Sequence, residues 1–198
     1  YTLPRRCSLD IPLMPSAPHE NRTDSQLVQA LNQGEPAAFD VLYFRYRDWV
    51  MRLALRFTGH HDDALDVLQE TFAYFVRKFP GFELTAALTT FLYPAVKNFS
   101  IAARRKRLRS VNEYEDALST IPATQLPEYQ DADELSKTLF GLSDPHREIL
   151  LMRFVDEMTQ PEIAAALDVP LGTVKSRLHH ALLAIRQSPA MREGLNER

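Results

Sequence analysis

Apolar side chains recur every three or four residues between positions 36 and 57, and this spacing constrains the fold more than any other feature of the chain. Residues three and four apart share one face of an α-helix, so the segment predicts a long amphipathic helix. The same spacing runs through residues 62–79 and, after the Pro80-Gly81 break, from near Phe91 to about Arg109. The chain has 6 glycines among 198 residues, too few for the many turns of a sandwich or barrel. We therefore predict an all-α fold.

Two stretches without a helical period interrupt this pattern. Residues 1–23 are rich in proline and predict a flexible amino-terminal tail. Residues 110–132 combine prolines with scattered serine and threonine, and residues 111–134 contain acidic side chains but no basic ones. This composition predicts a flexible acidic linker. We expect the linker to join two small helical domains, at residues 24–109 and 133–190.

Capping residues mark several of the predicted helix ends. Asp24 has the position of an N-cap for a short helix over residues 25–33, and Thr159 and Glu162 have the spacing of a capping box. Pro94 would disrupt a helix interior, so we expect this proline to lie in the first turn of its helix. The second domain is expected to contain short helices at residues 133–142, 145–155, 161–167 and 172–187.

Charge is segregated along the chain. The 23 basic and 26 acidic residues give a formal net charge of −3, an average that taken alone argues against a nucleic-acid-binding domain. Acidic side chains are concentrated at residues 62–70 and in the linker, however, and basic ones at residues 97–109 and 172–192. Basic runs of this density favour phosphate contacts, although the solvated end of a helix can have the same composition. The near-zero average therefore does not count against DNA binding.

Several site chemistries are not expected in this chain. Cys7 is the single cysteine and cannot form an internal disulfide, which fits a reducing cytoplasmic setting. No apolar run approaches the roughly 18 residues of a membrane span, and the amino terminus lacks the apolar core of a signal peptide. The histidine doublets at 60–61 and 179–180 point in different directions on a helix, which disfavours a metal site. With no catalytic motif present, we expect a cytoplasmic protein that is not an enzyme and has no metal, cofactor or membrane insertion.

Residues 161–187 have the form of a helix-turn-helix. A short alanine-rich helix is followed by a tight connection and a second helix, whose core-facing stripe contains Val174, Leu178 and Ala181. A hydroxyl and a long cation near a helix amino terminus can reach base edges and phosphates in the major groove. An ordinary helical hairpin with a solvated basic face would show the same pattern. The candidate DNA-contacting residues on the opposite face are Thr173, Lys175, Ser176, Arg177 and His180.

Two motif sets give the chain a family resemblance. GTVKSRL, with LSDPHREILLMRFVDEMTQPEIAAALDVP before it, resembles region 4 of bacterial sigma-70 family sigma factors of the extracytoplasmic-function (ECF) type. Two earlier stretches resemble region 2: LVQALNQGEPAAFDVLYFRYRDWV and DDALDVLQETFAYFVRKF. A third stretch resembles the helix that handles the promoter minus-ten element: FLYPAVKNFSIAARRKRLR. The resemblance covers most of the chain outside residues 1–23. It implies a non-catalytic subunit whose first domain binds core polymerase and opens the minus-ten region, while the second reads the minus-thirty-five element.

The resemblance implies two contacts with core RNA polymerase. The helix of residues 62–79 would dock on the clamp helices of the largest subunit, and the second domain would contact the flap of the second-largest subunit. On sequence alone, the acidic face of that helix is explained as well by a solvated helix amino terminus. An anti-sigma factor would be a further partner. The residues that match the docking motif are Asp63, Asp66, Gln69 and Glu70, while Leu65 stands where the family usually has another acid.

The resemblance also implies a minus-ten surface on the helix that follows Pro80-Gly81. Phe82, Phe91 and Tyr93 are aromatic side chains beside a basic run, an arrangement that can hold unstacked bases. We expect Tyr93, nevertheless, to be a core residue. Family members usually have other residue types at positions 91, 94 and 102. The candidate minus-ten residues are Phe91, Lys97, Asn98, Arg104 and Arg105.

Two other functions remain open at this point. A stand-alone helix-turn-helix regulator would bind duplex DNA tightly as a dimer and without polymerase. A sigma-like decoy would bind polymerase without using promoters, and the unusual residues at 91, 94 and 102 are consistent with it. A sigma factor, by contrast, is expected to bind DNA weakly when alone and to associate strongly with core polymerase.

Overall fold

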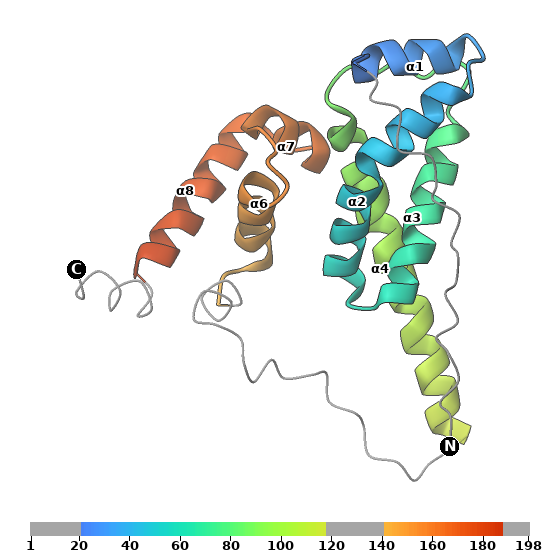
Figure 1. The fold of residues 1–198 in the computed structure, drawn as a ribbon. Coiled ribbons are helices and arrows are strands. Elements are labelled where there is room, and N and C mark those ends of the chain that lie inside the picture. The colour runs from blue at the N-terminus through green and yellow to red at the C-terminus, as the bar shows by residue number, and fades with distance from the viewer. Residues whose placement is uncertain (1–20, 118–140, 188–198) are drawn as a thin grey trace, which may run out of the picture.

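The computed structural model describes residues 21–117 and 141–187. Within these ranges the chain forms α-helices joined by short connections, and none of the described residues lies in a strand. The predicted all-α fold is confirmed. The helices, shown in Figure 1, are α1 (Asp24–Asn32), α2 (Ala37–Thr58), α3 (His61–Val76), α4 (Leu88–Ala117), α6 (Asp144–Phe154), α7 (Gln160–Leu167) and α8 (Leu171–Gln187).

Helices α1–α4 form the first lobe of the molecule. The long helices α2, α3 and α4 pack on one another, and α1 lies across the end of α2 (Figure 1). Leu42 and Leu53 of α2, Phe75 of α3 and Leu92 of α4 fill the centre and are all 0% exposed. Removing a Leu or Phe side chain from water stabilises a fold by about 1.5–3 kcal/mol. The apolar spacing seen in the sequence is therefore the stripe that holds the long helices together.

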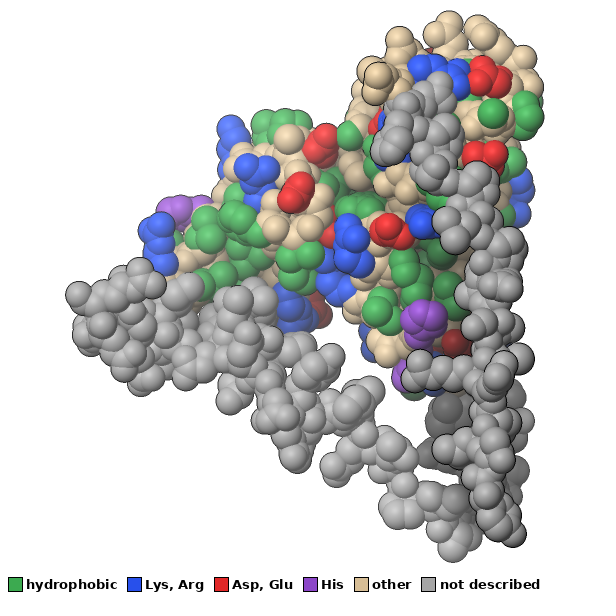
Figure 2. Space-filling model, in the orientation of Figure 1, with side chains coloured by type: hydrophobic (Ala, Val, Ile, Leu, Met, Phe, Trp, Pro, Cys, Tyr) green, Lys and Arg blue, Asp and Glu red, His purple; other side chains and the backbone are tan. Residues whose placement is uncertain are grey.

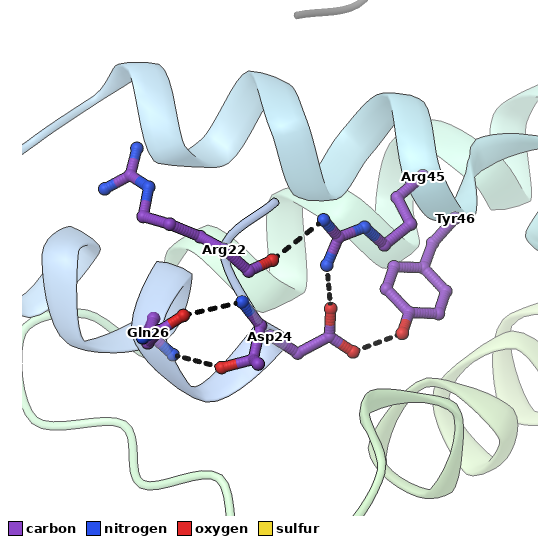
Figure 3. Close-up of polar contacts among 6 residues, drawn as sticks. Arg22, Asp24, Gln26, Arg45 and Tyr46 are labelled. Carbon is purple, nitrogen blue, oxygen red and sulfur yellow. Dashed lines mark hydrogen bonds and ion pairs between the residues drawn. The ribbon is translucent and has the colours of Figure 1, made fainter. Parts of the chain in front are cut away.

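The first helix is capped by Thr23, whereas the sequence predicted Asp24. The Thr23 Oγ1 accepts a hydrogen bond from the N–H of Gln26, and the Gln26 side chain accepts one from the N–H of Thr23. The Asp24 carboxylate instead accepts hydrogen bonds from Nη1 of Arg45, at 2.5 Å, and from the hydroxyl of Tyr46 (Figure 3). Burial and the Asp24 carboxylate raise the pKa of Tyr46. Asp24 thus ties α1 to α2.

Helix α4 is longer than predicted at both ends. It begins at Leu88 and continues to Ala117, so it enters the segment 110–132 that the sequence predicted to be a linker. The remainder of that segment lies outside the described residues, as do residues 1–20 of the predicted tail and most of the predicted helix at 133–142.

Pro94 lies inside α4, and the prediction that it would occupy the first turn is wrong. Proline has no N–H, so the carbonyl of Thr90 loses the helical hydrogen bond it would otherwise accept. The helix continues because packing offsets this loss: Leu92 and Val96, on either side of the proline, are both 0% exposed.

Helices α6–α8 form the second lobe and contain the predicted helix-turn-helix. Thr159 and Glu162 form the predicted capping box at the start of α7. Asp168, with a φ of 52°, turns the chain between α7 and α8 in the left-handed conformation. Val174 and Leu178 of α8 are 0% and 8% exposed. The predicted core-facing stripe is therefore confirmed, and it fixes the rotation of α8 about its own axis.

The two lobes are in contact. Helix α7 packs against α4, and one continuous cluster of buried side chains extends from Leu27 and Leu53 in the first lobe to Ile149 and Val174 in the second. Figure 2 shows acidic and basic side chains gathered where the lobes meet. The lobes therefore share a core as well as a chain connection.

Candidate functional site

The exposed face of α8 carries the residues predicted to contact DNA. Lys175, Ser176 and His180 are exposed, and Thr173 and Arg177 are half-exposed beside the buried stripe. Figure 2 shows Lys, Arg and His side chains along the outer edge of the second lobe. The positive end of the α8 dipole lies beside Thr173, where it favours an anion. This face combines cations, hydroxyls and a helix amino terminus, which together suit a nucleic-acid backbone and its base edges.

The acidic face of α3 lies against the basic end of α4. Asp66, Gln69 and Glu70 are exposed, whereas Asp63 accepts a hydrogen bond from Nη1 of Arg107 at 3.0 Å. The partners of this ion pair are 44 positions apart in the chain, so local spacing could not predict that the acidic and basic runs adjoin. The exposed acidic and amide groups remain accessible to a basic partner, while Asp63 is shared with α4.

Phe91 lies in an aromatic cluster near the start of α4. Its ring is stacked on that of Tyr74, with 5.7 Å between the centroids and 5° between the planes, and its centroid is 4.8 Å from that of Phe82. The Nζ of Lys78 lies 4.5 Å from the centroid of the Tyr74 ring, a cation–π contact. Sequence reasoning missed Tyr74 and Lys78 because they come from α3 and the turn after it. Tyr93 is 1% exposed, which confirms its prediction as a core residue.

The other candidate minus-ten residues of α4 differ in their surroundings. Asn98, Arg104 and Arg105 are exposed. Lys97, in contrast, contacts the second lobe, where its Nζ donates a hydrogen bond to Oε1 of Glu148 at 2.5 Å. Lys97 is therefore bound by the second lobe, whereas the side chains of Arg104 and Arg105 are exposed to solvent.

A second donor from α4, the helix that contains Lys97, also binds Glu148. The hydroxyl of Tyr93 donates a hydrogen bond to Oε1 of Glu148 at 2.9 Å. Burial raises the pKa of Tyr93, and the nearby negative charge of Glu148 raises it further. The tyrosine therefore stays a neutral donor, and two groups of α4 bind one carboxylate of α6.

A further ion pair joins the lobes at the end of α2. Arg56 donates from Nη2 to Oδ2 of Asp156 at 2.5 Å and from Nη1 to Oδ1 at 3.3 Å. The Asp156 side chain is 6% exposed. Arg56 and Asp156 are 100 positions apart, and Lys97 and Glu148 are 51 apart. Helical spacing relates residues three or four apart, so no signal in the sequence could have found either pair.

The described residues contain neither a membrane-spanning helix nor a metal-binding cluster. None of the helices in residues 21–117 and 141–187 is long and apolar enough to cross a bilayer. In the same ranges, no group of three or more His, Cys, Asp or Glu side chains is arranged to hold a metal ion. The rings of His179 and His180 are 5.7 Å apart but belong to no such group.

Two protein-family models match the chain. Sigma-70 region 2 matches residues 42–110, which include α3 and most of α4. Sigma-70, region 4 matches residues 138–187, which include the helix-turn-helix of α7 and α8. The two matches occur in the order that the sequence motifs indicated, and they contain the charged faces of α3, α4 and α8.

Relatives match the chain over most of their own length. The RNA polymerase sigma-H factor of Pseudomonas aeruginosa is 30% identical over 186 residues, which cover 86% of this chain and 96% of the relative. The ECF RNA polymerase sigma-E factor of Escherichia coli K12 is 30% identical over 180 residues, which cover 84% of this chain and 94% of the relative.

Solved structures share the fold. CnrH, in its complex with the cytosolic domain of CnrY, matches with a TM-score of 0.59 and 22% identity, covering 82% of this chain and 94% of CnrH. The sigma factor RpoE of Bartonella quintana, in complex with the anti-sigma factor NepR, matches with a TM-score of 0.51 and 24% identity, covering 73% and 91%. At these identities the likeness concerns the fold. Together with the sequence matches to both regions, it leads to one conclusion: this chain belongs to the sigma-70 family, as a sigma factor of the extracytoplasmic-function (ECF) type.

Proposed function

We propose that this sigma factor directs RNA polymerase to promoters with one surface for polymerase and two for DNA. The observation that carries the proposal is the orientation of α8, because its buried stripe leaves a basic and hydroxyl-bearing face in solvent. In this division of labour, residues 24–109 bind core polymerase and open the minus-ten region, and residues 133–190 read the minus-thirty-five element. The chain performs no chemical step itself, in keeping with a family whose members are initiation factors and not enzymes as a class.

On α8, recognition would use the exposed face in the major groove. Arg177 is long enough to reach a guanine edge or a phosphate, and Ser176 and Thr173 supply shorter hydroxyl contacts. Lys175 and His180 extend the same face. A good base contact of this kind contributes about 1–3 kcal/mol of discrimination against the wrong base pair, so several such contacts acting together are needed to select a promoter element.

On α3, polymerase binding would use the exposed polar side chains Asp66, Gln69 and Glu70, with Asp63 at the edge of the face. Carboxylates on an exposed helix face are complementary to a basic partner, and complementary charge accelerates association. The clamp helices of the largest polymerase subunit are the proposed partner of α3, and the flap of the second-largest subunit is the proposed partner of the second lobe.

On α4, minus-ten DNA would contact both basic side chains and an aromatic ring. Arg104 and Arg105 are exposed and can contact phosphates, which makes the binding dependent on salt. Phe91, half-exposed and stacked on Tyr74, offers a ring beside which an unstacked base can lie. Asn98 lies between these two groups along the helix.

The work of this protein is proposed to take place in the cytoplasm, where polymerase and chromosome are located. An anti-sigma factor is proposed as a regulatory partner, because the matching RpoE structure is a complex with one. Such a partner would have to cover the α3 face, the DNA-contacting faces, or both.

Reconstituted transcription tests the proposal. The full chain is mixed with core polymerase and genomic fragments, and transcription start sites are mapped by sequencing RNA 5′ ends. We expect starts that share upstream elements and that are absent with core polymerase alone.

The two alternative functions give different results in the same experiment. Tight binding to duplex DNA in the absence of polymerase, without new starts, would favour a stand-alone regulator. Association with core polymerase without new starts would favour a decoy. Either result would refute the proposed function.

A further inference from the structure

A hollow opens on the surface of the second lobe where α7 turns into α8. Asp168, in the left-handed conformation with a φ of 52°, redirects the chain at this point. The hollow, which we call the corner pocket, is lined mainly by apolar side chains: Pro161, Ala164 and Ala165 of α7, and Val169, Pro170 and Leu171 after the turn. Leu171 is the first residue of α8 and is 38% exposed. The fold therefore leaves an apolar surface accessible at the start of the predicted recognition helix.

The charge of the corner pocket disfavours a phosphate as its occupant. Asp168 also lines the pocket, and none of the lining residues that the structure describes is basic. A carboxylate repels a phosphate, whereas it can accept a hydrogen bond from the amino group of a cytosine. Apolar side chains contact the C5 methyl group that thymine presents in the major groove. The lining thus matches the edges of pyrimidine bases.

The corner pocket adjoins the face of α8 that the proposed function assigns to DNA. Leu171 and Lys175 are four residues apart, so their side chains are neighbours on the helix surface. The carbonyl of Pro170 accepts hydrogen bonds from the N–H groups of Thr173, at 2.9 Å, and Val174, at 3.3 Å, which fixes the pocket to the first turn of α8. In helix-turn-helix domains the amino-terminal residues of the recognition helix contact base edges. A base pair that contacts Thr173 or Lys175 therefore lies within about one helical turn of Leu171.

Gly172 leaves space beside Leu171 on the exposed side of α8. Its backbone is helical, and a Cβ atom added to it would meet no other part of the described fold within 4 Å. Glycine is a poorer helix former than alanine, so neither local conformation nor packing among the described residues explains a glycine at this position. A missing side chain does let another molecule approach the backbone closely. Gly172 therefore points to a contact with something outside the chain.

We infer that the corner pocket binds the C5 methyl group of a thymine in the minus-thirty-five element. Leu171 and Pro170 contact the methyl group, and the space at Gly172 lets the base pair come close enough for that contact. The inference rests on the proposed function of α8 and adds a determinant of specificity to it. The polar side chains of α8 recognise groups that form hydrogen bonds, and a methyl group forms none, so thymine is identified by a separate, apolar surface.

Deoxyuridine substitution tests the inference with the full chain and core polymerase. Each thymine of a mapped minus-thirty-five element, on either strand, is replaced singly by deoxyuridine, which lacks only the methyl group. Transcription is then measured against the concentration of the sigma factor. We expect at least one replacement to raise the concentration for half-maximal transcription about fourfold, the equivalent of one buried methyl group. If no replacement raises this concentration, the inference is wrong.

Leu171→Ala identifies the side chain that contacts the methyl group. On the thymine promoter, the variant should also require a concentration about fourfold higher than the parent chain. On the responsive deoxyuridine promoter it should lose little more, because the two changes remove the same contact. If the two losses multiply instead, Leu171 and the methyl group act independently, and the inference is wrong.

Gly172→Ala fills the space beside Leu171 without a clash inside the fold. Its Tm should equal or exceed that of the parent chain, because alanine is the better helix former and its Cβ atom enters open space. Transcription should nevertheless fall at least as far as with Leu171→Ala, since the added methyl group keeps the base pair away. Parent-like transcription from Gly172→Ala would show that DNA does not approach this position and would overturn the inference.

Leu55→Ala is the matched control for Leu171→Ala. Leu55 is also a leucine of similar exposure, at 40%, but it belongs to α2. Transcription by this variant should equal that of the parent chain on every promoter. An equal loss in Leu55→Ala would mean that Leu171 has no special role.

The same measurements separate failure of the inference from failure of the proposed function. If the parent chain gives no starts, or starts that depend on no minus-thirty-five element, the proposed function of α8 is refuted. Starts that depend on the element but not on any thymine methyl group would refute the corner pocket alone. Weaker binding of Leu171→Ala to core polymerase, without an effect of deoxyuridine, would likewise refute it and would assign the pocket to an apolar protein partner.

Discussion

The two helices proposed to touch DNA differ in how completely the protein leaves them accessible. On α8 the candidate contacts all lie at the surface, whereas on α4 Lys97 is bound by Glu148 and Phe91 is packed against Tyr74. The difference follows from position: α8 packs against α6 and α7, while α4 is contacted by α2, α3 and α7. A helix with more neighbours has fewer side chains left for a ligand. Four predictions test how far this contrast extends.

The largest effect is expected from the shared core. Phe75→Ala removes a side chain that is 0% exposed and should lower the free energy of unfolding by about 3–5 kcal/mol. Because the buried cluster continues into the second lobe, both lobes should lose stability together. Urea denaturation checks this with two probes, the fluorescence of Trp49, the single tryptophan, and the circular dichroism of all helices.

The neighbouring residue provides the control for this prediction. Val76 is 47% exposed, so Val76→Ala should change the unfolding free energy by less than about 0.5 kcal/mol. A circular-dichroism transition that splits in two, with one part unaffected by Phe75→Ala, would show that the lobes unfold independently.

The next effect concerns the accessible DNA surface. Arg177→Ala should reduce transcription from minus-thirty-five-dependent promoters by about 5- to 150-fold, the equivalent of one base contact of about 1–3 kcal/mol. Arg186→Ala removes an exposed arginine from the last turn of the same helix and should have little effect. Equal losses in the two variants would mean that α8 acts only through its overall charge.

A smaller effect is expected on the polymerase surface. Asp66→Asn/Glu70→Gln removes two exposed carboxylates from α3 and should weaken binding to core polymerase about fivefold, since exposed charges contribute about 1 kcal/mol or less. Binding is measured by titration of labelled protein with core polymerase. Asp62→Asn, an exposed residue outside the docking motif, serves as the control. Unchanged polymerase affinity in the double variant would show that these α3 carboxylates do not contribute to polymerase binding.

The smallest effect is expected at the beginning of the first lobe. Hydrogen bonds from Arg22 to the Glu35 carboxylate, at 2.7 and 3.1 Å, lower the pKa of Glu35. A carboxyl whose pKa is lower in the folded protein stabilises the fold above its unfolded pKa, and this contribution is lost as the pH falls through the folded pKa.

Thermal unfolding at several pH values measures this contribution. Glu35→Gln should therefore lower Tm slightly at neutral pH, and its difference from the parent chain should shrink as the pH falls below the usual glutamate pKa and vanish below the lowered pKa of the folded protein. The variant should transcribe normally, because Glu35 belongs to none of the proposed DNA or polymerase surfaces. A difference in Tm that grows as the pH falls would contradict the assigned cause.

Features set by residues three or four apart could be predicted from the sequence. The all-α fold, the capping box of Thr159 and Glu162 and the buried stripe of α8 all depend on such local spacing. The accessible face of α8 was predictable for the same reason, since burying one stripe of an amphipathic helix leaves the opposite face in solvent.

Features set by distant residues could not be predicted in this way. Asp24 has the residue type of an N-cap, but Arg45 and Tyr46 bind its carboxylate, and this contact exists only once α1 and α2 have packed. The position of Pro94 within α4 depends on packing against other helices, which overrides the local preference of proline. The surroundings of Lys97 depend on a carboxylate 51 positions away.

The Arg56–Asp156 contact bears on how far the two lobes are interchangeable among related proteins. Sigma-70 region 2 and region 4 match separate stretches of this chain, residues 42–110 and 138–187. Here a donor lobe that lacks a carboxylate at position 156 would leave a guanidinium, 24% exposed in the native chain, without its bidentate partner. Chimaeras that exchange only the second lobe should therefore succeed more often when the residues at positions 56 and 156 are inherited as a pair.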